Sequence, residues 1–261
     1  MKPLLLLFIL LLALPGTLAA GEPQPCDLSY PSDSQIPFTC RYFENGSWLE
    51  PQFGDLWTDL LRFNRLDRRH ADRGVCLRLP QQLSSLRSFS PLPQQWPEAV
   101  AAEKFILVDL SEQFLGAYSH GQLLFSLPIA TGDKLNETPT GTFTIDAFHR
   151  RHRSSLYTLE KSPLPYPMHF ALRFYINPSD VSYWIHGRDL PGYPASHGCI
   201  GLSDEEMQRH YYGYPPAPLL ADAQLLYDWV TEGIADNGGV TPLPNGPTLL
   251  IIGKTPVPKR H

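Results

Sequence analysis

Hydrophobic and polar positions in the second half of the chain follow the pattern of β-strands. Short runs rich in Phe, Leu, Val and Ile are separated by segments with Gly, Pro, Asp and Asn, as in strands joined by turns. A turn is expected near 119–121, between the first two runs. Strands are predicted over 105–110, 121–130, 141–145, 168–174, 183–186 and 248–252. Many strands and few helices favour a mostly β domain, which we place at residues 104–256.

Two helices are expected within this domain. Ser203-Asp204-Glu205-Glu206 has the form of a capping box, in which Ser203 caps the first amides and Glu206 reaches back. A helix should therefore begin just after Ser203. Residues 221–234 suit a second helix.

The first part of the chain predicts a small α+β module over residues 21–80. Residues 38–43 and 74–80 suit strands, and apolar residues at spacing i, i+1, i+4, i+5 predict a helix over 55–64. Residues 81–103 are rich in Gln, Ser and Pro, which indicates a linker.

Five arginines lie between positions 62 and 73, with Asp67 and Asp72 interleaved. Such a segment can meet an anionic polymer, but the mixed charges make a solvated helix face the expected arrangement. The formal net charge of the whole chain is −5. We therefore expect no nucleic-acid binding, which usually requires a basic protein or a basic block.

The first 20 residues have the form of a secretory signal peptide. Lys2 precedes an apolar run over 4–14, Pro15 and Gly16 end it, and small residues follow at 19–20. The run is shorter than the roughly 20 residues of a membrane span. We expect cleavage, export to the periplasm and a soluble mature protein.

Export affects how the four cysteines are interpreted. Cys26, Cys40 and Cys76 lie in the first third, and Cys199 stands alone far downstream. Thiols tend to pair in an oxidising compartment, so we expect one disulfide among the first three and a free Cys199. The sequence leaves the pairing open.

The candidate chemistry lies in two short segments, 183–187 (YWIHG) and 196–200 (SHGCI). A thiol attacks a carbonyl as thiolate and needs a base, which His186 can provide for Cys199 across a Pro- and Gly-containing loop. Gly198 leaves the backbone open, so nearby amides can point at an oxyanion. The helix expected after Ser203 begins close enough to favour a thiolate.

Two other interpretations of these residues remain open. An inert buried cysteine beside an unrelated histidine is the simpler one. A zinc site from His186, His197 and Cys199 is the other, although only Asp189 and Asp204 are nearby acidic candidates for a fourth ligand. We expect neither a metal nor another cofactor.

The two segments, IHG at 185–187 and SHGCI at 196–200, resemble the signature of the L,D-transpeptidase catalytic domain. Residues 106–118, 128–145 and 167–175 are similar to further segments of that family in the same order, so the resemblance covers 104 to about 205. The order of elements over 21–80 resembles a LysM peptidoglycan-binding module. A packing module without a ligand is the alternative.

The resemblance implies a β-sandwich fold and a peptidoglycan stem tetrapeptide as substrate. Cys199 would be the nucleophile and His186 the base, oriented by the carbonyl of Gly187. The oxyanion surroundings would come from His197, Gly198 and Cys199. Substrate contacts and loop support would come from Tyr183, Trp184, Arg188 and Ser196.

Two departures from the family pattern affect substrate recognition. Gly201 stands where the family often has a polar side chain, so Arg188 or another residue must replace it, and the loop between His186 and Cys199 looks short. The acceptor stays open. An amine, including that of a protein, gives a transpeptidase, whereas water gives a carboxypeptidase or endopeptidase. A non-catalytic wall-binding protein is the alternative of another class.

Overall fold

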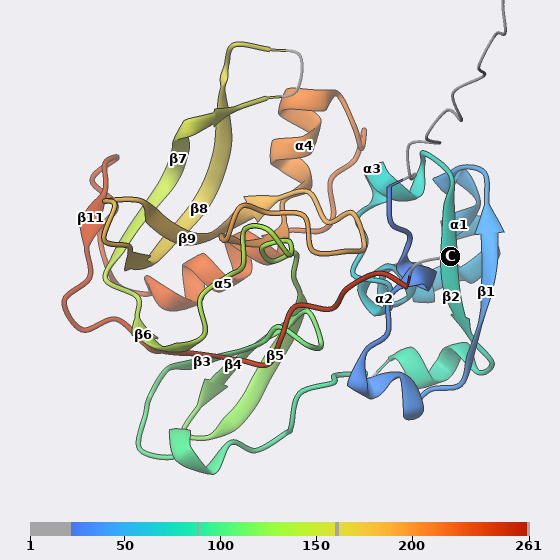
Figure 1. Ribbon diagram of the computed structural model, residues 1–261, viewed down its shortest axis with the longest axis horizontal. Helices are drawn as coiled ribbons and strands as arrows, with labels where there is room; N and C mark the ends of the chain where they lie inside the picture. The colour runs from blue at the N-terminus through green and yellow to red at the C-terminus, as the bar shows by residue number, and fades with distance from the viewer. Residues whose placement is uncertain (1–21, 88, 160–161, 260–261) are drawn as a thin grey trace, which may run out of the picture.

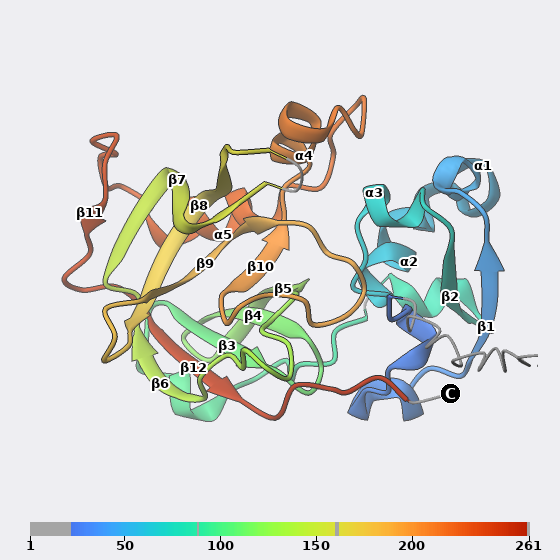
Figure 2. The same ribbon diagram turned by 45° about the horizontal axis from the view of Figure 1, so that its top comes forward.

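Two five-stranded sheets form the larger part of the molecule (Figures 1 and 2). The computed structural model describes residues 22–87, 89–159 and 162–259, so the expected signal peptide lies outside the described residues. The first sheet has the order β10-β9-β8-β7-β11. Its strands are Ala147–Thr158 (β7), Pro165–Ile176 (β8), Ser182–Arg188 (β9), Ile200–Ser203 (β10) and Thr241–Pro242 (β11).

The second sheet has the order β5-β4-β3-β12-β6. Its strands are Phe105–Asp109 (β3), Phe114–Ser119 (β4), Gln122–Pro128 (β5), Gly141–Thr144 (β6) and Thr248–Ile252 (β12). The prediction of a mostly β domain is confirmed. The turn at 119–121 joins β5 to β4 rather than to β3, because β4 lies between them in the sheet and pairs with both.

One apolar cluster joins the two sheets. Ile106 and Leu115 come from the second sheet, Leu172 and Ile185 from the first, and all four are at most 1% exposed. Helix α5 (Asp222–Val230) adds buried residues to the same cluster. Burial of apolar side chains on this scale holds the sheets face to face.

The start of helix α4 (Glu205–Tyr212) differs from the prediction. Ser203 belongs to β10, pairs with Arg188 in the ladder, and donates its hydroxyl to Asp222. Ser203 is the last residue of β10, so it lies one residue before the position that caps helix α4. Asp204 is the N-cap and accepts from the Met207 amide at 3.0 Å.

Strand β7 carries no clear signal in the sequence. It is 12 residues long and, apart from Ala147 and Phe148 at its start, is half-buried or exposed. It forms a long hairpin with β8 that extends beyond the sheet (Figure 1). Because most of the strand is polar, it lacks the alternation that a half-buried strand shows.

The first part of the chain forms a separate module beside the sheets (Figure 1). Strands Phe38–Phe43 (β1) and Val75–Pro80 (β2) pair in antiparallel fashion. Between them lie helices Leu49–Phe53 (α1), Trp57–Phe63 (α2) and Arg68–Ala71 (α3), with 3-10 helices Gly46–Trp48 (η3) and Gly54–Leu56 (η4). The helix predicted over 55–64 is therefore split at Trp57. Two further 3-10 helices, Pro25–Asp27 (η1) and Pro31–Ser34 (η2), precede β1.

The segment over 81–103 contains 3-10 helices Leu83–Leu86 (η5) and Pro97–Ala99 (η6). Leu92 and Ala99 are buried in a cluster with Phe105 and Tyr118 of the second sheet. The C-terminal tail then runs back from β12 to the module (Figure 1), where the Lys259 amide donates to the carbonyl of Asp27. No helix among the described residues has the length and apolar character needed to cross a membrane.

One disulfide joins Cys26 and Cys40, and Cys76 and Cys199 are free thiols. This confirms the prediction of one bridge among the first three cysteines with Cys199 unpaired. The bridge ties η1 to β1 within the module.

The arginines between 62 and 73 do not form the expected solvated face. Four of them make ion pairs with carboxylates of the β domain. These carboxylates are far apart in the sequence, so the sequence does not show that they meet the arginines. The pairs are Arg62–Asp222, Arg65–Glu112, Arg68–Glu205 and Arg69–Asp189. These arginines therefore bind the module to the sheets.

Arg65 is the most buried of the four, at 1% exposure. Its Nε and one terminal nitrogen donate to the Glu112 carbonyl at 3.1 and 3.0 Å, and its guanidinium lies 3.8 Å from the ring centre of Tyr30. The Glu112 carboxylate in turn accepts from the amide and hydroxyl of Ser32. The module and the β3–β4 turn thus share one buried polar network.

We expect Arg65→Ala to lower the free energy of unfolding by about 3–5 kcal/mol, because it leaves the Glu112 carboxylate buried without its charge partner. Urea unfolding followed by tryptophan fluorescence measures this change. The matched control is Arg87→Ala, which removes an ion pair with Asp55 on the exposed surface. Arg87→Ala should leave the urea midpoint of unfolding unchanged. An equal loss of unfolding free energy in both variants would contradict the role of the buried Arg65 network.

Candidate active site

Parallel pairing of β9 and β10 brings His186 and Cys199 to one side of the first sheet. The register places Gly201 opposite His186 and Ile200 opposite Ile185. Side chains alternate between faces along a strand, so Cys199, two residues before Gly201, shares the face of His186. Both side chains line one cavity of about 690 Å³. The structure therefore places the predicted nucleophile and base on one face of the sheet and in the wall of one cavity.

The imidazole of His186 is 4% exposed. Its Nδ1 lies 2.8 Å from the carbonyl oxygen of Gly187, the contact that the resemblance implied. A carbonyl only accepts, so Nδ1 carries the proton and Nε2 keeps its lone pair. Burial lowers the pKa of His186 to about 3, with the Gly187 hydrogen bond opposing and the Arg188 charge adding. The ring is therefore neutral at pH 7.

The thiol of Cys199 is half-buried, and Cys199 directly precedes β10. Burial raises its pKa, while a backbone hydrogen bond from Trp184 and the charge of Arg188 oppose the rise. At neutral pH the resting site thus holds a neutral thiol and a neutral imidazole. The prediction that the N-terminus of the next helix favours a Cys199 thiolate is wrong. Strand β10 separates Cys199 from the N-cap Asp204 by on the order of 15 Å.

Two buried hydroxyls hold the loop that carries Cys199. Ser196, 2% exposed, accepts from the Gly198 amide at 3.1 Å and donates to the Cys199 carbonyl at 2.5 Å. Thr138 donates to the Gly198 carbonyl at 2.9 Å and accepts from the Gly132 amide. Because the Gly198 amide is engaged by Ser196, the amides of His197 and Cys199 are the candidate oxyanion donors.

Glycine is required at position 198 for two reasons. Its φ is +108°, and a Cβ there would lie 2.5 Å from the Tyr183 ring. Gly187 is similarly constrained, since a Cβ there would lie 2.6 Å from the Asp204 carboxylate. Tyr183 therefore packs against the nucleophile loop, where it also lines the cavity.

Arg188 occupies the space that a side chain at position 201 would take. A Cβ on Gly201 would lie 2.0 Å from Cδ and 2.1 Å from Cγ of Arg188. The guanidinium keeps a single long contact at 3.4 Å, to the Ala195 carbonyl, and its Nε is buried without a hydrogen-bond partner in the described structure. The aliphatic part of Arg188 lies over Gly201, and its guanidinium, which has N–H donors without partners among the described residues, lines the cavity.

The remaining predicted residues lie in the wall of the cavity. Trp184 is 4% exposed and packs in a tilted arrangement against His152 of β7, at 4.3 Å between ring centres. His197 is exposed and stacks on Tyr157, also of β7, at 4.3 Å. The β7–β8 hairpin therefore covers the nucleophile loop, an arrangement that the sequence did not indicate.

Sequence reasoning missed the contribution of the module to this site. Arg69 of α3 lines the cavity and donates to Asp189 at 2.8 Å. Asp67, fully buried, accepts from the Leu190 amide and from Gln208, and thereby fixes the start of the loop between His186 and Cys199. Asp67 also caps α3 by accepting from the His70 amide, which is a local contact. The contacts of Asp67 and Arg69 with the site have no local signal, because those partners lie more than a hundred positions away.

The zinc alternative draws no support from the arrangement of ligand types. Among the described residues, the close group of His, Cys, Asp or Glu side chains is Cys26, Cys40 and Cys76. His186, His197 and Cys199 do not form such a group there, since His197 turns to Tyr157.

Residues 103–236 match the YkuD family model, the L,D-transpeptidase catalytic domain. A search of curated protein sequences gave no match. The match begins at residue 103, so the LysM resemblance of 21–80 stays a prediction.

Solved structures similar to this chain include L,D-transpeptidase 1 of Mycobacterium tuberculosis, at 18% identity and TM-score 0.37, covering 58% of this chain and 62% of that chain. Another is an L,D-transpeptidase of Xylanimonas cellulosilytica, at 20% identity and TM-score 0.41, covering 74% and 77%. A third, from Stackebrandtia nassauensis, has 17% identity and TM-score 0.41, covering 78% and 69%. The chain spans less than two thirds of the mycobacterial protein.

The neutral resting pair predicts how Cys199 responds to pH. Alkylation of Cys199 by iodoacetamide should accelerate about tenfold per pH unit between pH 6 and 8, because the reactive thiolate fraction grows tenfold per unit below the pKa. Peptide mapping of the alkylated protein separates Cys199 from Cys76. A rate that is flat across this range would show a preformed thiolate and contradict the neutral pair.

Proposed function

This chain belongs to the L,D-transpeptidase catalytic-domain family, and we propose that it acts on peptidoglycan stem tetrapeptides through a thioester on Cys199. The observation that carries the proposal is the shared cavity of Cys199 and His186, with the Gly187 carbonyl fixing the tautomer of the base. A thiol beside a neutral imidazole with a free Nε2 suits acyl transfer.

In the proposed reaction, Nε2 of His186 takes the thiol proton as Sγ of Cys199 attacks the carbonyl carbon of the third stem residue. The amides of His197 and Cys199 stabilise the oxyanion. The bond to D-alanine breaks, and the leaving amine takes the proton from His186. An acceptor amine then attacks the thioester, passes its proton to His186, and the thiol is restored.

Arg188 is the proposed partner of a substrate carboxylate. Stem peptides carry carboxylates, and a guanidinium with spare donors binds them in bidentate fashion. The packing of the Arg188 stem over Gly201 supports this role, since it fills the place of the missing polar side chain. Arg69, also in the cavity wall, donates to Asp189 and holds this part of the wall in place.

We place the reaction outside the cytoplasmic membrane, in the periplasm. The signal-peptide pattern of residues 1–20 and the Cys26–Cys40 disulfide support this location, because disulfides persist in oxidising compartments. A protein amine and a second stem peptide are both suitable acceptors.

Incubation with a purified disaccharide-tetrapeptide, followed by mass spectrometry, tests the proposal. The wild-type protein should release D-alanine and give a cross-linked dimer, and intact-mass analysis should find the acylated enzyme. Cys199→Ala should form neither, while Cys76→Ser, which removes the other free thiol, should act like the wild type. Release of D-alanine with only tripeptide formed would instead assign water as the acceptor.

The base is tested in the same assay. His186→Ala should lower the rate by about 10²–10⁴-fold, the usual worth of a general base. Cys199→Ala that retains turnover, or His186→Ala that matches the wild type, would contradict the mechanism. Thermal melting of each variant checks that the fold is kept.

Arg188→Ala should raise KM by about 10- to 100-fold with a smaller change in kcat, since it removes a charge-assisted hydrogen bond to the bound substrate. Arg188→Lys should recover part of the loss because the charge remains. The control is Arg209→Ala, which removes an exposed arginine paired with Glu206. An unchanged KM in Arg188→Ala would remove Arg188 from the binding site.

A chelator should leave turnover unchanged, because the proposed oxyanion donors are backbone amides and the base is an imidazole. The assay is repeated after dialysis against EDTA, with and without added zinc. Activity that disappears on chelation and returns with zinc would favour the zinc site over the thiol–imidazole pair.

A further inference from the structure

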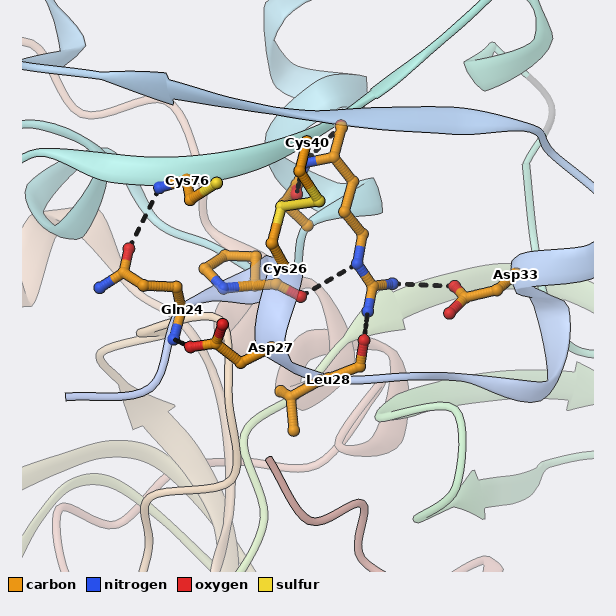
Figure 3. The surroundings of a disulfide bond; sticks show 10 residues. Gln24, Cys26, Asp27, Leu28, Asp33, Cys40 and Cys76 are labelled. Atoms are coloured by element: carbon orange, nitrogen blue, oxygen red, sulfur yellow. Dashed lines mark hydrogen bonds and ion pairs between the residues drawn. A yellow bond between two sulfur atoms is a disulfide. The ribbon is translucent and has the colours of Figure 1, made fainter. Parts of the chain in front are cut away.

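Three sulfur atoms lie together in the N-terminal module (Figure 3). None of the three cysteines lines the catalytic cavity. Cys26 and Cys40 form the disulfide, with their Cα atoms 6.1 Å apart, and Cys76 is a free thiol beside it. All three sulfurs lie within 4.8 Å of one another. A thiol at this distance from a disulfide is positioned for exchange.

We propose that these cysteines form a thiol–disulfide exchange site, in which Cys76 attacks the bridge at Cys26 and releases Cys40 as an exposed thiolate. The Cys76 thiolate forms a new bond to Cys26 Sγ, and the electron pair of the broken bond leaves on Cys40 Sγ. Cys76 loses its proton to water and Cys40 gains one. The number of disulfides is unchanged, so no oxidant or reductant is consumed.

The strand register selects Cys26 as the sulfur that Cys76 attacks. Cys40 pairs with Arg78 and Cys76 pairs with Tyr42, which makes Cys40 and Cys76 diagonal neighbours across β1 and β2. Diagonal pairs are roughly 7–8 Å apart, beyond the Cα spacing usual for a disulfide. A bridge between Cys40 and Cys76 would therefore need the strands to shift.

Cys26 is free of this restriction because it lies on η1, outside the strand pair. Gln24 Oε1 accepts from the Cys76 amide at 3.1 Å, which holds the chain before Cys26 next to β2 (Figure 3). The buried guanidinium of Arg78 donates to the carbonyls of Pro25 and Leu28. These contacts keep η1 in place whichever strand Cys26 is bonded to.

Exchange changes which thiol faces solvent. Cys76 is half-buried, and burial, with the nearby Asp27 charge, raises its pKa. Cys40 is exposed on β1. The exchanged form thus presents a thiol that can attack the disulfide of a small molecule or of another protein, and the resting form does not. The proposal is independent of the transpeptidase assignment.

Alkylation of the unreduced full-length protein tests the exchange. The protein is held at pH 8 with excess iodoacetamide, sampled over hours, and mapped by mass spectrometry without reduction. We expect label to accumulate on Cys40 together with an equal amount of Cys26–Cys76 disulfide, because alkylation traps the exposed thiol. Label confined to Cys76, with Cys26–Cys40 intact throughout, would overturn the proposal.

Two variants identify the attacking thiol. Cys76→Ser should lose all label on Cys40, and Cys199→Ala, which removes the other free thiol, should keep it. Label on Cys40 in Cys76→Ser would mean that another thiol opens the bridge, which contradicts the proposal. Recovery of all three cysteines as thiols with bound zinc would also contradict it and assign the cluster to a metal.

A second probe measures reaction with an outside disulfide. Wild-type protein incubated with glutathione disulfide should gain a mixed disulfide on Cys40, identified from the peptide mass. Cys76→Ser should gain none there. Glutathione found on Cys76 alone would show that the half-buried thiol reacts directly, without exchange.

Discussion

The active site depends on the parallel pairing of β9 and β10. That register fixes Gly201 opposite His186, and the two-residue period of a strand then sets Cys199 on the face of the imidazole. Two parallel neighbours need a connection that leaves one end of the sheet and returns to the other. The loop over 189–199 is this connection, so whatever holds the loop also holds the nucleophile.

The loop is held from two directions. On one side, Thr131 accepts from the Ser196 amide and Thr138 donates to the Gly198 carbonyl. On the other, Asp67 of the module receives the Leu190 amide. The module is therefore part of what positions the site. The ion pairs between its arginines and the β domain keep Asp67 beside Leu190. Burial of the His186 ring keeps it neutral, which the proposed role as a base requires.

The sequence predicted the free Cys199 and the mostly β architecture, and it pointed to Cys199 and His186 as the candidate catalytic pair, because each left a local signal. Apolar runs marked the strands, and the IHG and SHGCI segments marked the chemistry. It did not predict β7, whose polar residues carry no periodicity, or the cap at Asp204, since Ser203 is drawn into β10 by its pairing with Arg188. The roles of Arg65 and Asp67 depend on partners that only the folded chain brings near.

Nuclear magnetic resonance of His186 tests the account most directly. In ¹⁵N-labelled protein, with the signals assigned by comparison with His186→Gln, the ring should be neutral from pH 5 to 8. The proton should lie on Nδ1, bonded to the Gly187 carbonyl, and Nε2 should show the shift of an unprotonated nitrogen. A ring that is protonated on both nitrogens at pH 7 would contradict a neutral base and favour a preformed thiolate–imidazolium pair.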